Sequence, residues 1–173
     1  LKPTNTYSLT KKFNEDLSEI FLKYYKIKPI GLRFFTVYGE WGRPDMFIAK
    51  AIDAAFKNKK LFINNYGNHS RDFTYIKDVN IILYKLMNRK ISIDNNIINI
   101  CSNNPINIIK IVRYIEKYSK KINIQKRNMQ LADVLKTHGS NYRIIKNKLL
   151  KKFTNFDQGI KNTIQWYKKY HKI

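Results

Sequence analysis

The chain has 173 residues, of which 43% are hydrophobic and 14% aromatic, so it can bury the core of one domain and is not expected to be disordered. Its 34 basic and 12 acidic residues give a formal net charge of +22. Only seven of the basic residues are Arg, and the lysines are scattered in ones and twos, which argues against a nucleic-acid-binding stripe. We expect no nucleic-acid partner, although a basic surface suits anionic small molecules.

The sequence also disfavours membrane-spanning proteins and proteins stabilised by disulfides. No apolar run approaches the roughly 20 residues of a membrane helix, and the first residues contain no signal-peptide core. The single cysteine, Cys101, excludes an internal disulfide and fits a reducing cytoplasm, where it is expected to be a small buried residue. The turn-like start, which lacks Met and enters a helix directly, is expected of a piece of a longer protein.

The first predicted element is a helix over 4–26. Five apolar residues recur along it at helical spacing and form one stripe, with Pro29 and Gly31 after its end. These residues are Phe13, Leu17, Ile20, Phe21 and Tyr24. Tyr7 and Lys11 lie four residues apart at the border of the stripe. They are either an ordinary solvated pair or a phenol with a cation that lowers its pKa.

The rest of the chain alternates between strand and helix patterns. Asp78 and Asp157 are expected to cap or open helices, and Pro105 is expected near a helix start. The alternation predicts an α/β fold with a parallel sheet. Strands are predicted at 30–39, near 60–64, at 72–75, 95–101 and 121–126, and helices at 46–58, 77–89, after 105, at 142–150 and at 157–171.

Two loops contain residues suited to anionic ligands. Arg43 lies between a strand end and a helix start, where it either binds an anionic group or is a solvated side chain of a packed loop. Arg71 either holds a phosphate or pairs with Asp72 or Asp78. No cluster has metal-ligand spacing, and Gly39-x-x-Gly42 lacks the third glycine of a dinucleotide-binding fingerprint.

Together, these stretches resemble the extended short-chain dehydrogenase/reductase family of nucleotide-sugar enzymes, and within it the UDP-glucuronate 4-epimerases. The resemblance spans almost the whole chain. Its strongest motifs are "YSLTKKFNE" (7–15), "GLRFFTVYGEWGRPDMFIAKAI" (31–52) and "YGNHSRDFTYIKDV" (66–79), and weaker ones cover 99–108, 129–137 and 159–173.

The resemblance implies the C-terminal part of a Rossmann-like fold together with the smaller substrate-binding domain. Residues 1–36 and about 71–101 would belong to the Rossmann core, and 37–70 and 102–173 to the substrate-binding part. The cofactor would be NAD, the substrate a UDP-sugar, and the full-length protein a cytoplasmic homodimer that pairs through the helix at 4–26.

The resemblance also assigns roles to individual residues. Tyr7 would be the catalytic acid/base, and Lys11 would bind the nicotinamide ribose and lower the tyrosine pKa. The tyrosinate would take the C4 hydroxyl proton while hydride passes to NAD⁺, and the 4-keto sugar would turn over and accept the hydride on its other face. The remaining assignments are Phe35 near the nicotinamide, Thr36 and Arg43 on the uronate carboxylate, Arg71 on the diphosphate and Asp133 near the nucleotide.

Some family features differ or are missing. The glycine-rich NAD loop and a catalytic Ser/Thr precede the tyrosine in the family and are not in this sequence, so we expect the 173 residues alone to be inactive. Glu40 replaces the usual proline, and 131–133 reads Leu-Ala-Asp in place of Pro-Gly-Asp. The alternatives are another enzyme of the family (a UDP-galactose-type epimerase, dehydratase or decarboxylase) or a non-catalytic remnant or interaction module.

Overall fold

The computed structural model describes residues 3, 5–88, 96–129 and 134–173. Helices and strands alternate along most of this length, as the sequence pattern predicts. In chain order the elements are α1 (Thr6–Tyr25), β1 (Gly31–Phe34), β2 (Thr36–Tyr38), α2 (Phe47–Lys57), β3 (Lys60–Ile63), the short turn η1 (Asn64–Gly67), β4 (Ser70–Tyr75), α3 (Ile76–Asn88), β5 (Ile97–Ile100), β6 (Pro105–Asn107), α4 (Ile108–Tyr118), β7 (Asn123–Lys126), α5 (Tyr142–Lys146) and α6 (Phe156–His171).

In the described part of the chain, the strands form three small sheets. β1 pairs with β5, β2 with β4 and β3 with β7, and all three pairs are parallel. β6 adds to β4 in the antiparallel direction. Parallel pairs joined through helices are the signature of an α/β fold. The predicted fold class is therefore confirmed.

The predicted strand over 30–39 is in fact two strands that join different sheets. The break falls at Phe35, whose backbone N–H donates to the carbonyl of Ile100 at 3.1 Å. β1 runs beside β5, and β2 continues beside β4. One continuous apolar run therefore crosses from one sheet to the next.

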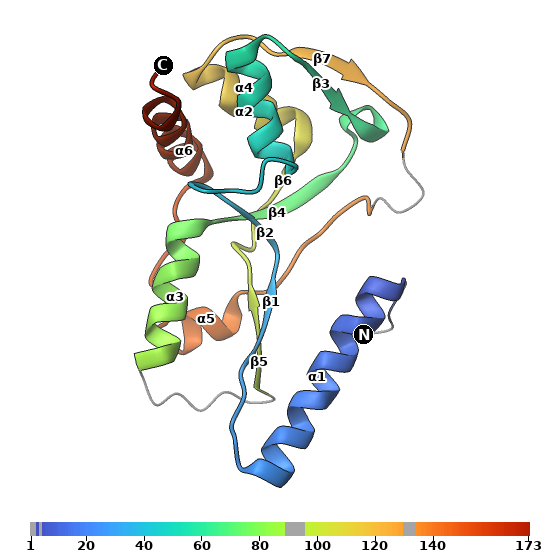
Figure 1. Cartoon of the computed structure of the whole chain (residues 1–173), viewed down its shortest axis with the longest axis vertical. Coiled ribbons are helices and arrows are strands. Elements are labelled where there is room, and N and C mark those ends of the chain that lie inside the picture. Colours follow the sequence, from blue (N-terminus) through green and yellow to red (C-terminus); the bar gives the residue numbers. More distant parts are fainter. Residues whose placement is uncertain (1–2, 4, 89–95, 130–133) are drawn as a thin grey trace.

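Two hydrophobic cores lie at opposite ends of this crossing (Figure 1). One lies among α2, α4 and α6 and includes Ile52, Ile111 and Ile160, all essentially inaccessible to solvent. The other lies beside β5, α3 and α5 and includes Ile82 and Ile98. Ile76, at the start of α3, packs against both cores.

The first helix is attached to the rest of the molecule through its polar side. None of the twenty described residues of α1 is buried. Its partly buried positions are mostly polar: Ser8, Lys12, Glu15, Ser18 and Leu22. The apolar stripe predicted from the sequence, from Phe13 to Tyr24, is exposed, and α1 stands to one side of the molecule (Figure 1).

The local predictions are met to different degrees. Pro105 lies near a helix start as predicted, but it belongs to the short strand β6, and α4 begins at Ile108, after Asn107, whose side chain accepts from Ile109 N at 2.9 Å. Asp157 is not the cap of α6, since Asn155 takes that position. Asp78 lies in the first turn of α3, where its carboxylate is buried and accepts two hydrogen bonds from Thr154.

The last two predicted helices differ in how well their bounds match. The predicted helix at 142–150 ends early, at Lys146, whereas that at 157–171 is matched by α6. Among the residues that the structure describes, no helix combines the length and apolar character that a bilayer crossing requires.

Candidate active site

The tyrosine and lysine of the first helix lie side by side on an open surface. α1 begins at a capping box in which the Asn5 side chain accepts from Ser8 N at 2.8 Å and Ser8 Oγ accepts from Asn5 N at 3.1 Å. This cap places Tyr7 in the first turn, where its side chain is 71% exposed. The Lys11 ammonium lies 5.2 Å from the centroid of the Tyr7 ring. A negative charge that develops on this phenol would have a cation beside it.

Arg43 lies in the loop between β2 and α2, and its guanidinium forms a fork-to-fork pair with Asp45. Its Nε donates to Asp45 Oδ1 at 3.0 Å, and its Nη2 donates to Asp45 Oδ2. This pairing raises the pKa of Arg43, and the phenol of Tyr7 adds a smaller contribution in the same direction.

Glu40, at the position where the family resemblance implies a proline, is bound by residues of β4 and α3. Its carboxylate accepts from the Tyr75 hydroxyl at 2.8 Å and pairs with Lys77 at 3.1 Å. Burial favours the neutral acid, but the hydrogen bonds from its own backbone, Tyr75 and Lys77 outweigh it, and the pKa of Glu40 is lowered. The acid therefore belongs to a packed contact with β4 and α3.

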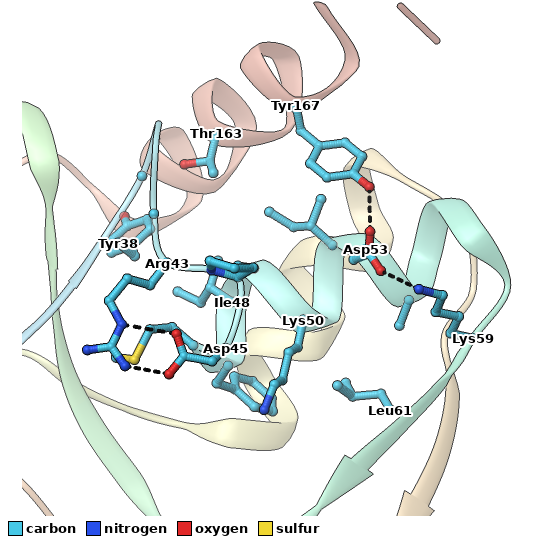
Figure 2. Close-up of a pocket in the computed structure, with 18 of the residues that line it drawn as sticks. Tyr38, Arg43, Asp45, Ile48, Lys50, Asp53, Lys59, Leu61, Thr163 and Tyr167 are labelled. Atoms are coloured by element: carbon cyan, nitrogen blue, oxygen red, sulfur yellow. Dashed lines mark hydrogen bonds and ion pairs between the residues drawn. The ribbon is translucent and has the colours of Figure 1, made fainter. Parts of the chain in front are cut away.

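A pocket of about 890 Å³ opens around α2, between the β2–α2 loop, β3 and α6 (Figure 2). Thr36 and Arg43 are among its lining residues. On its other side, Asp53 accepts from the Tyr167 hydroxyl at 2.9 Å and pairs with Lys59 at 3.2 Å (Figure 2). Burial, aided by Asp53, raises the pKa of Tyr167 to about 12. That hydroxyl is therefore a structural donor near neutral pH.

The other predicted site residues that the structure describes lie outside the lining of this pocket. Phe35 is half-buried against Gly139, where a side chain on the glycine would come within 2.4 Å of the ring. Arg71 lies on β4 opposite Ile106, and its Nη1 donates to Ser70 O at 3.0 Å. Asp133 lies outside the described residues.

Next to Arg71 on β4, Asp72 holds the loop that follows β5. Asp72 is fully buried and accepts from Ser102 N at 3.1 Å, Ser102 Oγ at 2.7 Å and Asn103 N at 3.0 Å. Sequence reasoning overlooked this anchoring role, although an acid inside the strand "RDFTY" is itself a signal, since an unpaired carboxylate is rarely buried.

Nucleophile and metal chemistry receive little support from the described residues. Cys101 is fully buried, as expected, and burial, followed by the Asp72 charge, raises its thiol pKa to about 12. Within residues 3, 5–88, 96–129 and 134–173, no three His, Cys, Asp or Glu side chains gather as a metal site would require.

Comparison with known proteins decides the family. The sequence model of the NAD dependent epimerase/dehydratase family matches residues 1–101, more than half of the chain. The chain belongs to the NAD dependent epimerase/dehydratase family. NAD is accordingly the cofactor of the family to which these residues belong.

Members of the NAD dependent epimerase/dehydratase family match over nearly all of the chain. An uncharacterized protein of Methanocaldococcus jannaschii is 36% identical over 96% of the chain and 51% of its own length. The UDP-glucuronate 4-epimerase 4 of Arabidopsis thaliana is 32% identical over 98% of the chain and 43% of its own length. The chain thus spans about half the length of the curated relatives it matches.

A solved structure of the same family has the same fold. The UDP-glucuronic acid 4-epimerase from Bacillus cereus, in complex with UDP-glucuronic acid and NAD, matches with a TM-score of 0.89 and 26% identity. The match covers 98% of this chain and 54% of the Bacillus chain.

Tyr7 and Lys11, which the family resemblance assigns to the nicotinamide ribose, are both exposed and therefore accessible to a ligand. The Gly39–Gly42 turn does not fit a pyrophosphate, because Gly42 N donates to Gly39 O at 3.2 Å. The Ile76 side chain also lies only 2.3 Å from where a Cβ on Gly39 would be, so protein atoms fill that space.

Proposed function

We propose that the chain carries the acid/base and sugar-binding side of a UDP-glucuronate 4-epimerase. The observation that carries this proposal is the exposed pair on α1, in which the Lys11 ammonium lies 5.2 Å from the centroid of the Tyr7 ring. Arg43, on the β2–α2 loop, adds an exposed guanidinium that already holds a carboxylate with two hydrogen bonds. A proton-transfer group together with such an arginine suits a sugar that carries both a hydroxyl and a carboxylate. The named activities of the Arabidopsis and Bacillus relatives support this substrate.

In this proposal, residues of the chain bind the sugar and transfer a proton. The bound NAD would supply the hydride chemistry. Tyr7 Oη takes the proton of the sugar C4 hydroxyl, and Lys11 balances the charge that develops on Tyr7 during the transfer. Phe35 covers the nicotinamide side of the site.

Arg43 and Thr36 hold the uronate carboxylate. The bidentate pair that Arg43 now forms with Asp45 has the geometry of that contact, so the substrate carboxylate would replace Asp45. Arg71 and Asp133 complete the proposal as the diphosphate and nucleotide contacts.

The proposal extends to domains and assembly. Residues 1–36 and about 71–101 would serve the NAD part and 37–70 and 102–173 the sugar part of a cytoplasmic enzyme. The full-length protein would form a homodimer through the exposed stripe of α1. Since the sequence holds no glycine-rich pyrophosphate loop, we expect the 173 residues neither to retain NAD nor to turn over UDP-glucuronate; turnover above background would contradict this.

The substrate is tested by titrating the 173-residue chain with UDP-glucuronate and with UDP-glucose in a calorimeter. We expect UDP-glucuronate to bind about tenfold more tightly, a preference worth about 1.4 kcal/mol. Arg43→Ala should remove the preference, whereas Arg113→Ala, at an exposed position of α4, should keep it. Equal binding of both nucleotide sugars would favour a UDP-galactose-type epimerase, and binding of neither would favour a non-catalytic role.

A further inference from the structure

Trp41, two residues before Arg43, contacts two aromatic residues of the C-terminal helix. Its ring centroid lies 5.3 Å from that of Trp166 and 5.1 Å from that of Tyr170. The Trp166 and Tyr170 rings stack on each other at 5.3 Å with an interplanar angle of 16°. We propose that Trp166 and Tyr170 are positioning residues, which hold Trp41 and thereby set where Arg43 lies; the consequence for the sugar rests on the proposed function.

Burial alone does not account for these contacts. Trp41 is 74% exposed and Tyr170 54% exposed, whereas Trp166 is partly buried against the core, so the three rings form a cluster where the core meets the surface. Aromatic pairs at these separations contribute about 0.5–1.5 kcal/mol beyond the area that they bury. The contacts therefore restrict the loop more than they shield apolar surface from water.

The backbone at Trp41 indicates that something fixes it. Its φ of 60° lies in the left-handed region, which a bulky side chain seldom adopts. Such a conformation persists where the surroundings over-determine it, and it occurs often at ligand-binding loops. The rings of Trp166 and Tyr170, on α6, contact Trp41 from outside the loop and restrict its conformation in this way.

The loop is fixed to the body of the molecule before Arg43 and closed on itself after it. Gly39 packs against Ile76, and Glu40 is bound by Tyr75 and Lys77. Beyond Trp41, by contrast, the loop bonds to itself: Arg43 pairs with Asp45, and Met46 N donates to Arg43 O at 3.1 Å. Trp41 is thus the point of attachment next to Arg43.

The helix on the other side of the contact, α6, is packed against the core. α6 is held against β2 at Gly159, where an added Cβ would lie 2.1 Å from the Tyr38 hydroxyl oxygen. Ile160 and Ile164, on the same helix, are buried in the core. A helix seated in this way can transmit its position to the loop through Trp166 and Tyr170.

Hydrogen exchange of the intact 173-residue chain, resolved by mass spectrometry, tests the contact directly. In the double variant Trp166→Ala/Tyr170→Ala we expect peptides over 39–46 to exchange about tenfold faster, while those over 31–38 and 47–57 keep their protection. Trp166→Phe should restore most of the protection, and Met87→Ala, at an exposed site on α3, should change nothing. Unchanged exchange over 39–46, or a rise spread evenly over α6 and β2, would overturn the proposal.

Selectivity provides the second readout. The ratio of the dissociation constants for UDP-glucose and UDP-glucuronate should fall toward one in the double variant and recover in Trp166→Phe. Faster loop exchange with an unchanged ratio would refute the positioning of Arg43. If the unmodified chain shows no preference for UDP-glucuronate, the proposed function fails, and the exchange experiment alone decides whether α6 holds the loop.

Discussion

Asp72 connects β4 to the loop that follows β5. Its two carboxylate oxygens accept from both the backbone and the hydroxyl of Ser102 and from the backbone of Asn103, without exposure to solvent. Removal of the carboxylate would leave these partly buried donors without their partner, and an unsatisfied donor costs more free energy than the net contribution of an ordinary hydrogen bond.

We therefore expect Asp72→Ala to lower the free energy of unfolding by about 3 kcal/mol, and Asp72→Asn to lower it by less, because the amide keeps one acceptor oxygen. Urea denaturation followed by circular dichroism measures the difference. Asp16→Asn, on the exposed side of α1, is the matched control and should stay within about 0.5 kcal/mol of the unmodified chain. A loss at Asp72 no larger than at Asp16 would contradict the anchoring role.

The candidate site was predictable at this scale only in part. The i, i+4 spacing of Tyr7 and Lys11 defines their common face, and the structure keeps them together because a helix fixes that spacing. The orientation of Glu40 was not predictable, since it depends on Tyr75 and Lys77, which lie far along the chain. The roles of Tyr7, Lys11, Phe35, Thr36, Arg43, Arg71 and Asp133 in catalysis and binding stay predictions.

At the scale of elements, one ion pair attaches α1 to β1. Arg33 Nε and Nη2 donate to the two carboxylate oxygens of Glu15 at 2.6 and 2.7 Å. The bond from Arg33 lowers the pKa of Glu15 below its ordinary value of 4.5. A carboxyl whose pKa is depressed by folding stabilises the folded state above its ordinary pKa, and the contribution disappears as the pH falls through the folded-state value.

Glu15→Gln should therefore cost about 1 kcal/mol at pH 7, a modest value because Arg33 is partly solvent-exposed. The difference from the unmodified chain should stay constant down to about the ordinary value of 4.5 and then shrink at lower pH. Urea unfolding at several pH values measures it. A difference that grows on acidification would show that the pair does not stabilise the fold in this way.

Element boundaries were predicted best where local chemistry sets them. α1 and α6 begin at Asn caps and lie within a few residues of their predicted ranges. The division of the strand at Phe35 and the short strand β6 were missed, because both depend on partners distant in sequence: β5 for the first and β4 for the second. Periodicity carries no information about such pairings.

For the whole molecule, the exposed stripe of α1 is the largest departure from a self-contained fold. Phe13, Leu17, Ile20, Phe21 and Tyr24 all face solvent, although they repeat at the spacing of a packed helix. If the stripe is the homodimer surface, Leu17→Glu/Phe21→Glu should lower the mass measured by light scattering toward that of a monomer. Met87→Glu, at a more exposed site on α3, should leave the mass unchanged. A monomeric unmodified chain would contradict dimer formation through this helix at this length.

The continuous segment of β1 and β2 contributes to two sheets, and this determines how the molecule unfolds on heating. Leu32 and Val37 pack with the core around Ile82 and Ile98, whereas Tyr38, the next residue, belongs to the core around Ile52 and Ile160. Because the two cores pack on one continuous segment, unfolding of either core disrupts the strand on which the other packs. Their unfolding equilibria are therefore coupled. Calorimetry should therefore record a single transition whose van't Hoff and calorimetric enthalpies agree, and not two separate steps. Two resolved heat-capacity peaks would mean that the break at Phe35 works as a hinge.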